Sequence, residues 1–382
     1  MADPASRTPH ANACRRSARL VRLLAAGLVA AQFAPAAARA QLPLERLRLP
    51  PGFAVALFAE VPGARSLAVA EQGARIYVGT RGDRVYAVLD PDRDRRADQV
   101  VEVAAGLKVP NGVALGPDGA LFVVEQHQIS RFDPSGEREV VVPPGVLPDF
   151  RHHGWRYAAF GPDRRLYVTI GAPCNVCAVR GFEGTIVRMR PDGHELEVFA
   201  RGVRNSLGLD WHPRTGELFF TDNGGDGLGD HVPPDELNRA PEPYLHFGYP
   251  YLYAPGQPYP QFADEEPPER IRHPVVTFEA HVAALGVRFY RGRMFPREYR
   301  HDALVAQHGS WNRSAPIGYR IERVRFDADG RPIGREVFVD GWLGPGGRAW
   351  GRPVDLAELP DGSLLVSDDH AGAIYRITYR GR

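Results

Sequence analysis

The sequence predicts an all-β protein, a six-bladed β-propeller with one long inserted loop segment. Three observations support this prediction. A turn followed by an apolar strand recurs along the chain, and its copies start roughly 45–60 residues apart, except for one longer gap. No long 3.6-residue periodicity indicates extended helices. The 41 glycines and 35 prolines suit many short strands joined by turns.

The first residues carry the features of a secretory signal peptide. An apolar stretch over 20–34 follows a basic region, and small residues lead to Ala40. We therefore expect a signal peptide over 1–40, cleavage after Ala40, export to the periplasm, and a catalytic propeller over 41–382. A membrane anchor is disfavoured because the stretch is shorter than the roughly 20 residues a span needs. The basic residues are Arg15, Arg16, Arg19 and Arg22, and the first pair leaves Sec and twin-arginine export both open.

Each repeated unit begins with a turn in which Pro sets φ, Asp caps the turn and Gly takes a positive φ, so the next strand pairs back as a hairpin. The clear copies are 116–119 before 121–124, 161–163 before 166–171, 212–216 before 218–222, and 359–362 before 364–368. Looser copies at 73–79 and 302–308 bring the number of blades to six. Residues 53–59 precede the first unit and are strand-like, so we expect them to complete the last blade and close the ring.

The segment 225–284 is rich in Pro, Tyr and Asp and is too long for a plain connection. It either covers one face of the ring or packs outside the blades, and its length alone does not separate these two interpretations.

Charge and cysteine content narrow the partners and the compartment. The 47 Lys and Arg residues balance 46 Asp and Glu residues, which argues against nucleic acid as a partner. No second apolar segment follows the signal, so no membrane span is expected in the mature chain. Cys174 and Cys177 are predicted to form a disulfide after export, with free thiols or a metal site as alternatives. Ala178 stands where haem attachment would need His.

Four polar segments are unusual for the inner strands of a propeller. His153 in 151–156 can accept a proton from a substrate hydroxyl, although a histidine there is more often an ordinary hydrogen-bonded residue. Arg and Asn in 202–206 can bind a planar ligand rich in oxygen. The glycines in 221–226 expose carbonyls to a hard cation, and 351–355 supplies another arginine.

Together these motifs resemble the soluble PQQ-dependent dehydrogenases of aldoses and sorbosone, where PQQ is pyrroloquinoline quinone. The resemblance covers almost all of the mature chain and follows the family's order. Its motifs are the segment 161–171 behind a histidine, Gly-Val-Arg-Asn at 202–205, Asp-Asn-Gly at 222–224, Asp-Glu-Leu-Asn at 235–238, Phe-Gly-Tyr-Pro at 247–250, His-Gly-Ser-Trp-Asn-Arg at 308–313 and Gly-Arg-Pro at 351–353.

The resemblance implies a PQQ- and Ca²⁺-dependent oxidoreductase that oxidises a small-molecule sugar or polyol, of the sorbosone or aldose type, by hydride transfer to the quinone. An external electron acceptor would then reoxidise the cofactor, because no cytochrome motif is attached. The roles it implies are His153 as catalytic base with His152 beside it, Arg204 as a catalytic and cofactor-binding residue, Asn205, Asn223 and Arg352 at the cofactor, and the carbonyls of Gly224 and Gly225 on Ca²⁺.

Two positions depart from the family's pattern. The acid that orients the base in aldose dehydrogenases is replaced by Ala172, so Asn175 or the Cys174–Cys177 loop is expected to substitute. The lysine that holds the cofactor has no clear match, and we expect His308 or Arg313 in its place.

Two other functions remain as alternatives. A metal-dependent propeller hydrolase of the lactonase type would bring several Asp, Asn and Glu side chains together as ligands. A non-catalytic propeller binding module would concentrate its distinctive residues on loop faces. The arginines and the histidine beside the candidate metal loop favour an anionic cofactor instead.

Acidic residues also recur at 90, 92, 94 and 98, the spacing of a calcium loop. Arg95 occupies the position of the usual glycine, and no terminal glutamate follows. A hairpin turn stabilised by Asp side chains is the alternative interpretation.

Overall fold

The structure is a computed structural model that describes residues 42–94 and 96–381. The predicted signal peptide over 1–40 and its cleavage point at Ala40 lie outside the described residues. Over those two ranges, no helix has the length and apolar character needed to cross a lipid bilayer.

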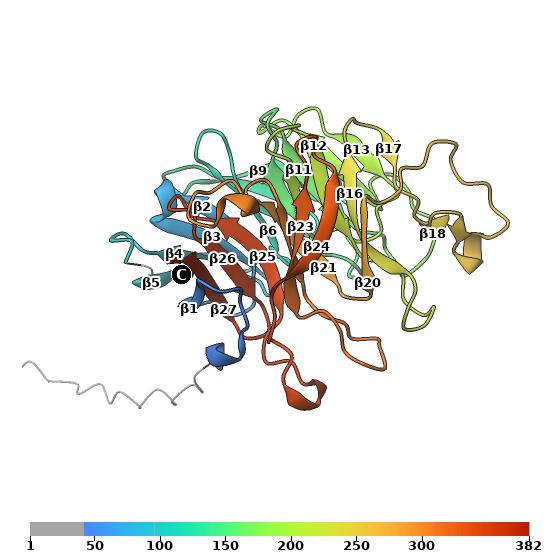
Figure 1. The fold of residues 1–382 in the computed structure, drawn as a ribbon. Helices are drawn as coiled ribbons and strands as arrows, with labels where there is room; N and C mark the ends of the chain where they lie inside the picture. The colour runs from blue at the N-terminus through green and yellow to red at the C-terminus, as the bar shows by residue number, and fades with distance from the viewer. Residues whose placement is uncertain (1–41, 95, 382) are drawn as a thin grey trace, which may run out of the picture. The chain divides into compact units, whose positions relative to one another are not determined.

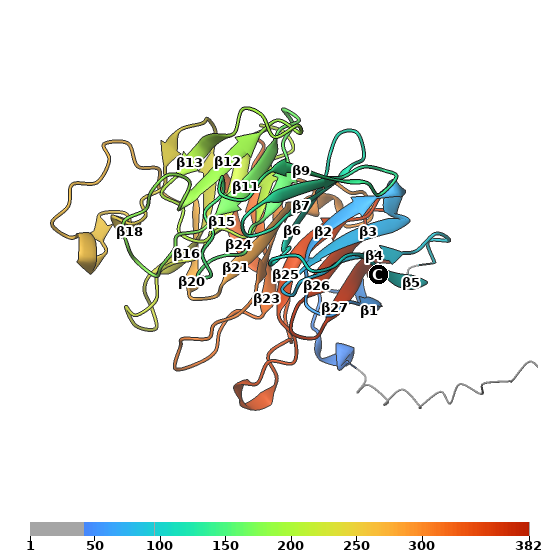
Figure 2. The same cartoon turned by 180° about the vertical axis from the view of Figure 1, so that it is seen from behind.

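Six sheets form the six predicted blades, and all their strand pairs are antiparallel except the parallel pair β13–β17 of blade three (Figures 1 and 2). Blade one contains β2 (Ala64–Ala70), β3 (Arg75–Thr80), β4 (Val85–Leu89) and β5 (Gln99–Ala104), and blade two contains β6 (Gly112–Leu115), β7 (Leu121–Val124), β8 (Ile129–Phe132) and β9 (Arg138–Val142). Blade three contains β10 (Ala158–Phe160), β11 (Leu166–Ile170), β12 (Thr185–Met189), β13 (Glu197–Arg201) and the added β17 (Leu245–His246). Blade four contains β14 (Leu209–Trp211), β15 (Leu218–Asp222), β16 (Pro234–Ala240) and β20 (Val276–Ala280). Blade five contains β21 (Ala284–Phe289), β22 (Ala303–Gln307), β23 (Arg320–Phe326) and β24 (Pro332–Val339), and blade six contains β25 (Pro353–Glu358), β26 (Leu364–Asp368), β27 (Ala373–Tyr379) and β1 (Phe53–Glu60).

The helices of the described chain are five short 3₁₀ turns, which agrees with the absence of a helical period in the sequence. They are η1 (Leu44–Arg46), η2 (Glu71–Gly73), η3 (Pro260–Phe262), η4 (Arg297–Tyr299) and η5 (Pro345–Gly347).

The repeated turn joins the first and second strands of a blade, as predicted. In blade two, Asp118 Oδ1 accepts the Ala120 N–H at 3.2 Å, and Gly119 has a φ of +82°. The hairpin of β6 and β7 then pairs antiparallel from Gly112 opposite Val124 to Leu115 opposite Leu121. Local turn chemistry therefore fixes where each blade begins.

One apolar cluster lies between each pair of neighbouring blades, and this explains why the strands read as continuous apolar runs. In β7, Leu121 and Val123 pack towards blade one, whereas Phe122 and Val124 pack towards blade three. Alternate side chains of a strand point to opposite faces of its sheet, and here both faces are buried. The blades are thus held by face-to-face packing around the ring.

The ring closes as expected through the N-terminal strand. β1 pairs antiparallel with β27, from Phe53 opposite Tyr379 to Glu60 opposite Ala373. The Phe53 ring packs on those of Phe295 and Phe338, with centroids 4.8 and 5.1 Å apart. Both ends of the described chain therefore contribute strands to blade six.

The inserted segment is shorter than 225–284, because β16 and β20 belong to blade four. The excursion proper runs over 241–275 and holds β17, η3 and a two-stranded ribbon of β18 (Leu252–Ala254) and β19 (Gln257–Pro258). In Figures 1 and 2 the ribbon projects beyond blade four. It contributes no lining residue to the cavity described below, which favours packing outside the blades.

Candidate functional site

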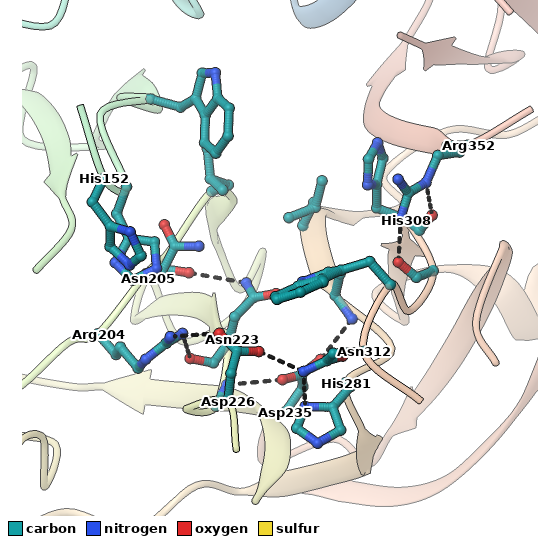
Figure 3. A pocket seen from close by; sticks show the side chains of 18 of the residues that line it. His152, Arg204, Asn205, Asn223, Asp226, Asp235, His281, His308, Asn312 and Arg352 are labelled. Carbon is teal, nitrogen blue, oxygen red and sulfur yellow. Dashed lines mark hydrogen bonds and ion pairs between the residues drawn. The ribbon is translucent and has the colours of Figure 1, made fainter. Parts of the chain in front are cut away.

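A cavity of about 610 Å³ lies at one end of the propeller, and six of the residues predicted for the site line it. They are His153, Arg204, Asn205, Asn223, Gly224 and Arg352. Figure 3 shows His152, Arg204 and Asn205 on one wall and Arg352 with His308 on the opposite wall. His153 and Arg352, which are 199 residues apart in sequence (352 − 153), thus face a common space.

The topology of the blades explains this convergence. His153, Arg204 and Arg352 lie in connections that lead into the innermost strands β10, β14 and β25, whereas Gly224 and His308 directly follow the second strands β15 and β22. In an up-and-down blade, the start of the first strand and the end of the second lie at the same edge. All these residues therefore lie at the same end of the ring.

The His153 side chain is held by a backbone carbonyl rather than by an acid. Its Nδ1 lies 2.9 Å from the carbonyl oxygen of Ala172. A carbonyl only accepts, so Nδ1 carries the proton and Nε2 keeps its lone pair. Burial, with Arg204 and His152 as further causes, lowers the pKa of His153 to about 2. The imidazole is therefore neutral and able to accept a proton.

Ala172, which stands where the family has an acid, thus orients His153 through its backbone carbonyl. Gly171 allows this approach, because a Cβ there would lie 2.6 Å from the His153 Cβ. The expected substitution of Asn175 for the acid is not what the structure has, since Asn175 contacts Arg204 instead. The sequence could not reveal this, because any residue at 172 supplies the same carbonyl.

Arg204 is buried, and its guanidinium is fixed from three directions. Nε donates to the Asn175 carbonyl at 2.9 Å, and Nη2 donates to Asn175 Oδ1 at 2.8 Å and lies 3.3 Å from Asp226 Oδ2. Nη1 donates to the Asn223 carbonyl at 3.1 Å. Asn175 lies inside the loop closed by the Cys174–Cys177 disulfide, which confirms the predicted pairing. That loop therefore holds the arginine at the cavity wall.

A buried carboxylate organises the backbone of this wall. Asp222 accepts the N–H groups of Arg204 at 2.8 Å, Asn205 at 2.6 Å and Asn223 at 3.0 Å. Burial raises the pKa of Asp222 to about 7, although these donors act in the opposite direction. The Asn205 Oδ1 atom is buried without a hydrogen-bond partner among the described residues. Such an atom is costly unless a ligand satisfies it.

The two glycines after β15 have different surroundings. Gly224 lines the cavity, and its N–H donates to Asp235 Oδ1 at 2.8 Å. Gly225 is not part of the lining, and its N–H donates to the Tyr259 hydroxyl at 3.0 Å. Tyr259 comes from the 241–275 excursion, so the excursion supports the wall from behind.

The opposite wall is a network of cations around Asp369. Asp369 accepts from Arg65 at 2.6 Å and Arg81 at 3.3 Å, and lies 2.8 Å from His308 Nε2. Burial acts to raise the pKa of Asp369, but these three groups together hold it below its ordinary value. Burial lowers the pKa of His308 to about 4. Arg352 Nε donates to the His308 carbonyl at 2.9 Å, which joins it to the network.

Several lining residues were not predicted. Arg65 and Arg81 place their guanidinium carbons 5.5 and 5.6 Å from the Trp155 ring centre, one cation–π pair each. Trp311 also lines the cavity and is 76% exposed. Of the unpredicted residues in this wall, only Asp369 could have been found from the sequence. It is the first residue after β26, just as Asn223 is the first residue after β15.

Arg313 lies away from the cavity lining. Its Nη1 donates to the carbonyl of Ala280 at 3.1 Å and to that of Asp230, which fixes the loop after β22. Of the two residues expected in place of the family's lysine, the structure brings only His308 to the cavity.

Comparisons with known proteins extend these observations. Residues 239–380 match the family model described as TrAA12-like. An uncharacterized protein of Borreliella burgdorferi is 33% identical over 355 residues, covering 87% of this chain and 91% of that protein.

Solved structures share the fold. The PQQ domain of pyranose dehydrogenase from Coprinopsis cinerea has a TM-score of 0.71 at 19% identity, covering 87% of this chain and 97% of that one. The calcium structure of a Trichoderma reesei carbohydrate-active enzyme of family AA12 has a TM-score of 0.74 at 19% identity, covering 89% and 99%. At these identities the likeness establishes the six-bladed fold.

Proposed function

We propose that the chain oxidises a sugar or a sugar-derived hydroxyl or aldehyde with PQQ and Ca²⁺, because residues 239–380 match the TrAA12-like family model and the motifs of the chain resemble the soluble PQQ-dependent sugar dehydrogenases. The observation that carries the proposal is the pairing of a neutral buried histidine with a wall of arginines in one cavity. A proton acceptor and a binding site for an anionic cofactor are the two things this reaction requires of the protein.

The donor set of the cavity fits PQQ. The molecule is planar and carries three carboxylates, and the lining contains five arginines and two aspartates. The two acids are already engaged, Asp226 with Arg204 and Asp235 with the N–H groups of Gly224 and Ala283. The arginines therefore leave an excess of positive charge for an anion. The unpartnered Asn205 Oδ1 supplies an acceptor.

The residues that would hold the cofactor are Arg204, Asn205, Asn223 and Arg352, with His308 on the wall that Arg352 joins. Ca²⁺ would bind the Gly224 carbonyl, because a hard cation prefers oxygen ligands. Gly225, the second glycine that the resemblance implies for Ca²⁺, lies behind the lining, and its N–H donates to the Tyr259 hydroxyl. When bound, PQQ supplies a quinone carbon that accepts hydride.

The protein's own residues then have separate tasks. His153 Nε2 accepts the proton of the substrate hydroxyl, and the Ala172 carbonyl keeps the ring in the tautomer that allows this. Arg204 stabilises negative charge that develops near the cavity wall, and its four contacts prevent it from moving away. Trp155 and Leu207 limit access of water from their side of the lining.

The hydrolase alternative is not favoured by the site. Among residues 42–94 and 96–381, the one group of three His, Cys, Asp or Glu ligand atoms close enough to share a metal lies at Asp90, Asp92 and Asp98, and none of these lines the cavity. The binding-module alternative predicts distinctive residues on outer loops, whereas here they converge inside the ring. We also propose export to the periplasm, and the disulfide supports it.

Dye-linked turnover tests the proposal. Purified protein reconstituted with PQQ and Ca²⁺ should reduce an artificial acceptor in the presence of aldoses or sorbosone, and omission of either cofactor should abolish the reduction. Saturable PQQ binding without reduction by any sugar in the panel would contradict the proposed oxidoreductase activity.

A further inference from the structure

The connection between β4 and β5, on the outer side of blade one, carries a cluster of acidic side chains that the cavity does not use. Asp90, Asp92 and Asp98 each place one carboxylate oxygen within 4.8 Å of the others. Calcium binds oxygen at about 2.3–2.6 Å, so two oxygens on one ion lie at most about 5 Å apart. The three carboxylates are therefore close enough to share one calcium ion.

Asp90 is the residue that distinguishes this cluster from a solvated acidic turn. It is 1% exposed, and its Oδ1 has no hydrogen-bond partner among the described residues. A buried carboxylate oxygen without a donor is unfavourable, whereas a bound cation would satisfy it.

Arg376, the one cation known to act electrostatically on Asp90 among the described residues, has other hydrogen-bond partners. Its Nε donates to Ser363 Oγ at 2.7 Å, and its Nη2 binds Asp361. No ion pair between Arg376 and Asp90 occurs within the part of the chain that the structure describes. Within residues 42–94 and 96–381, Asp90 therefore has no ion-pair partner.

We propose that Asp90, Asp92 and Asp98 bind a structural calcium ion at the outer edge of blade one, separate from the cavity. Asp92 and Asp98 are exposed, so water completes the coordination shell. Asp94, the remaining acid of the spacing, is not a member of the cluster, and its Oδ1 accepts the Arg96 N–H at 2.8 Å.

The location gives the ion a role in closing the ring. Within the same connection, the Ala97 N–H donates to the Phe58 carbonyl in β1 at 2.9 Å, and the Asp98 N–H donates to the Leu89 carbonyl at 2.8 Å. Ala97 packs on the apolar cluster between blades one and six. An ion between Asp90 and Asp98 fixes the connection that holds β1, the strand that completes blade six.

Calcium binding to chelator-treated, PQQ-free protein tests this proposal independently of the cavity. The wild type should bind one more Ca²⁺ per chain by isothermal titration calorimetry than the Asp90→Asn/Asp92→Asn variant, with a Kd of about 10⁻⁴–10⁻³ M. In 10 mM CaCl₂ its Tm should rise by about 2–5 °C, and that of the variant should not. Mg²⁺ should bind more weakly, because it demands shorter octahedral contacts.

Two further variants control the result. Asp94→Asn removes the same unit of charge from the same connection and should keep the site. Asp98→Asn changes an exposed residue, so it should fold and weaken binding at least about tenfold even if the double variant does not fold. Equal calcium affinity in the wild type and Asp98→Asn, or complete loss of binding in Asp94→Asn, would overturn the proposal. Neither result bears on dye reduction.

Discussion

At the scale of single residues, the neutral state of His153 follows from its surroundings. The Ala172 carbonyl accepts from Nδ1, while burial and Arg204 disfavour the charged ring. Replacing His153 by Ala should lower turnover by about 10²–10⁴ with PQQ still bound, because the proton acceptor is lost and the arginines are not. Dye-linked kinetics together with a PQQ binding titration measure both effects.

His152 provides the matched control for this variant. Its ring centre lies 4.0 Å from that of His153. If turnover depended only on the presence of an imidazole ring in this region, His152→Ala would therefore lower it as well. We expect that variant to keep turnover within about tenfold of the wild type. Wild-type activity in His153→Ala, or the larger loss in His152→Ala, would move the base to His152.

The sequence predicted the site residues that belong to ordered motifs and missed those that do not. Arg204, Asn205 and Asn223 stand in short segments with several unusual residues each, so they could be found. Arg65 reaches Asp369 across 304 positions, and nothing in either local sequence predicts the pairing. Such contacts are set by ring closure rather than by local pattern.

At the scale of elements, the end of β11 determines where the base stands. A Cβ on Gly171 would lie 2.6 Å from the His153 Cβ and 3.0 Å from its carbonyl oxygen. Gly171→Ala should therefore displace His153, lower turnover by about 10²-fold and destabilise the protein by about 1–3 kcal/mol. Turnover and urea unfolding should be measured on the same preparation.

Gly82→Ala is the control for this substitution. The nearest atom to a Cβ at that position is Thr80 Oγ1, 3.8 Å away, so the added methyl group meets no close neighbour. We expect its free energy of unfolding to stay within about 0.5 kcal/mol of the wild type. A Gly171→Ala protein with unchanged turnover would show that the close approach of the two segments is unimportant.

The pairing of β15 with β16 sets two acids opposite each other, Asp222 and Glu236. Burial, then Asp222, raises the pKa of Glu236 to about 8, whereas an unfolded glutamate titrates near about 4.3. Between these values the folded protein holds a proton that the unfolded chain releases, so stability falls as the pH rises. Glu236→Gln has no carboxyl group to titrate, so its free energy of unfolding should not fall in this way as the pH rises.

Urea unfolding at pH 5, 6.5 and 8 measures this effect. The stability of Glu236→Gln relative to the wild type should improve by roughly 1–3 kcal/mol between pH 5 and pH 8. Glu269→Gln, on the exposed excursion, should show no such trend. A difference that does not depend on pH would contradict the raised pKa.

The strands were predictable because turn residues mark them and because both sheet faces are buried. The boundary of the insertion was not, because β16 carries the polar motif 235–238 rather than an apolar run, and so resembles loop sequence. Its place in blade four depends on pairing with β20 across the excursion, which is a contact of tertiary structure.

At the scale of the whole molecule, packing between blades places the site. Each pair of neighbouring blades shares one apolar cluster, and β1 with β27 completes blade six. A closed ring fixes the ends of its inner strands relative to one another, so Arg204 and Arg352 can face each other across the cavity (Figure 3). The number of blades was predictable from repeats, whereas the lining depends on how the ring closes.

An anaerobic absorption titration with PQQ and Ca²⁺, followed by addition of sugar, tests whether this cavity is a quinone site. We expect saturable, calcium-dependent binding of one PQQ per chain, weakened at least about tenfold in Arg352→Gln, and conversion to the reduced spectrum when sugar is added. Absence of saturable PQQ binding, or equal affinity in the wild type and Arg352→Gln, would contradict a quinone site in this cavity.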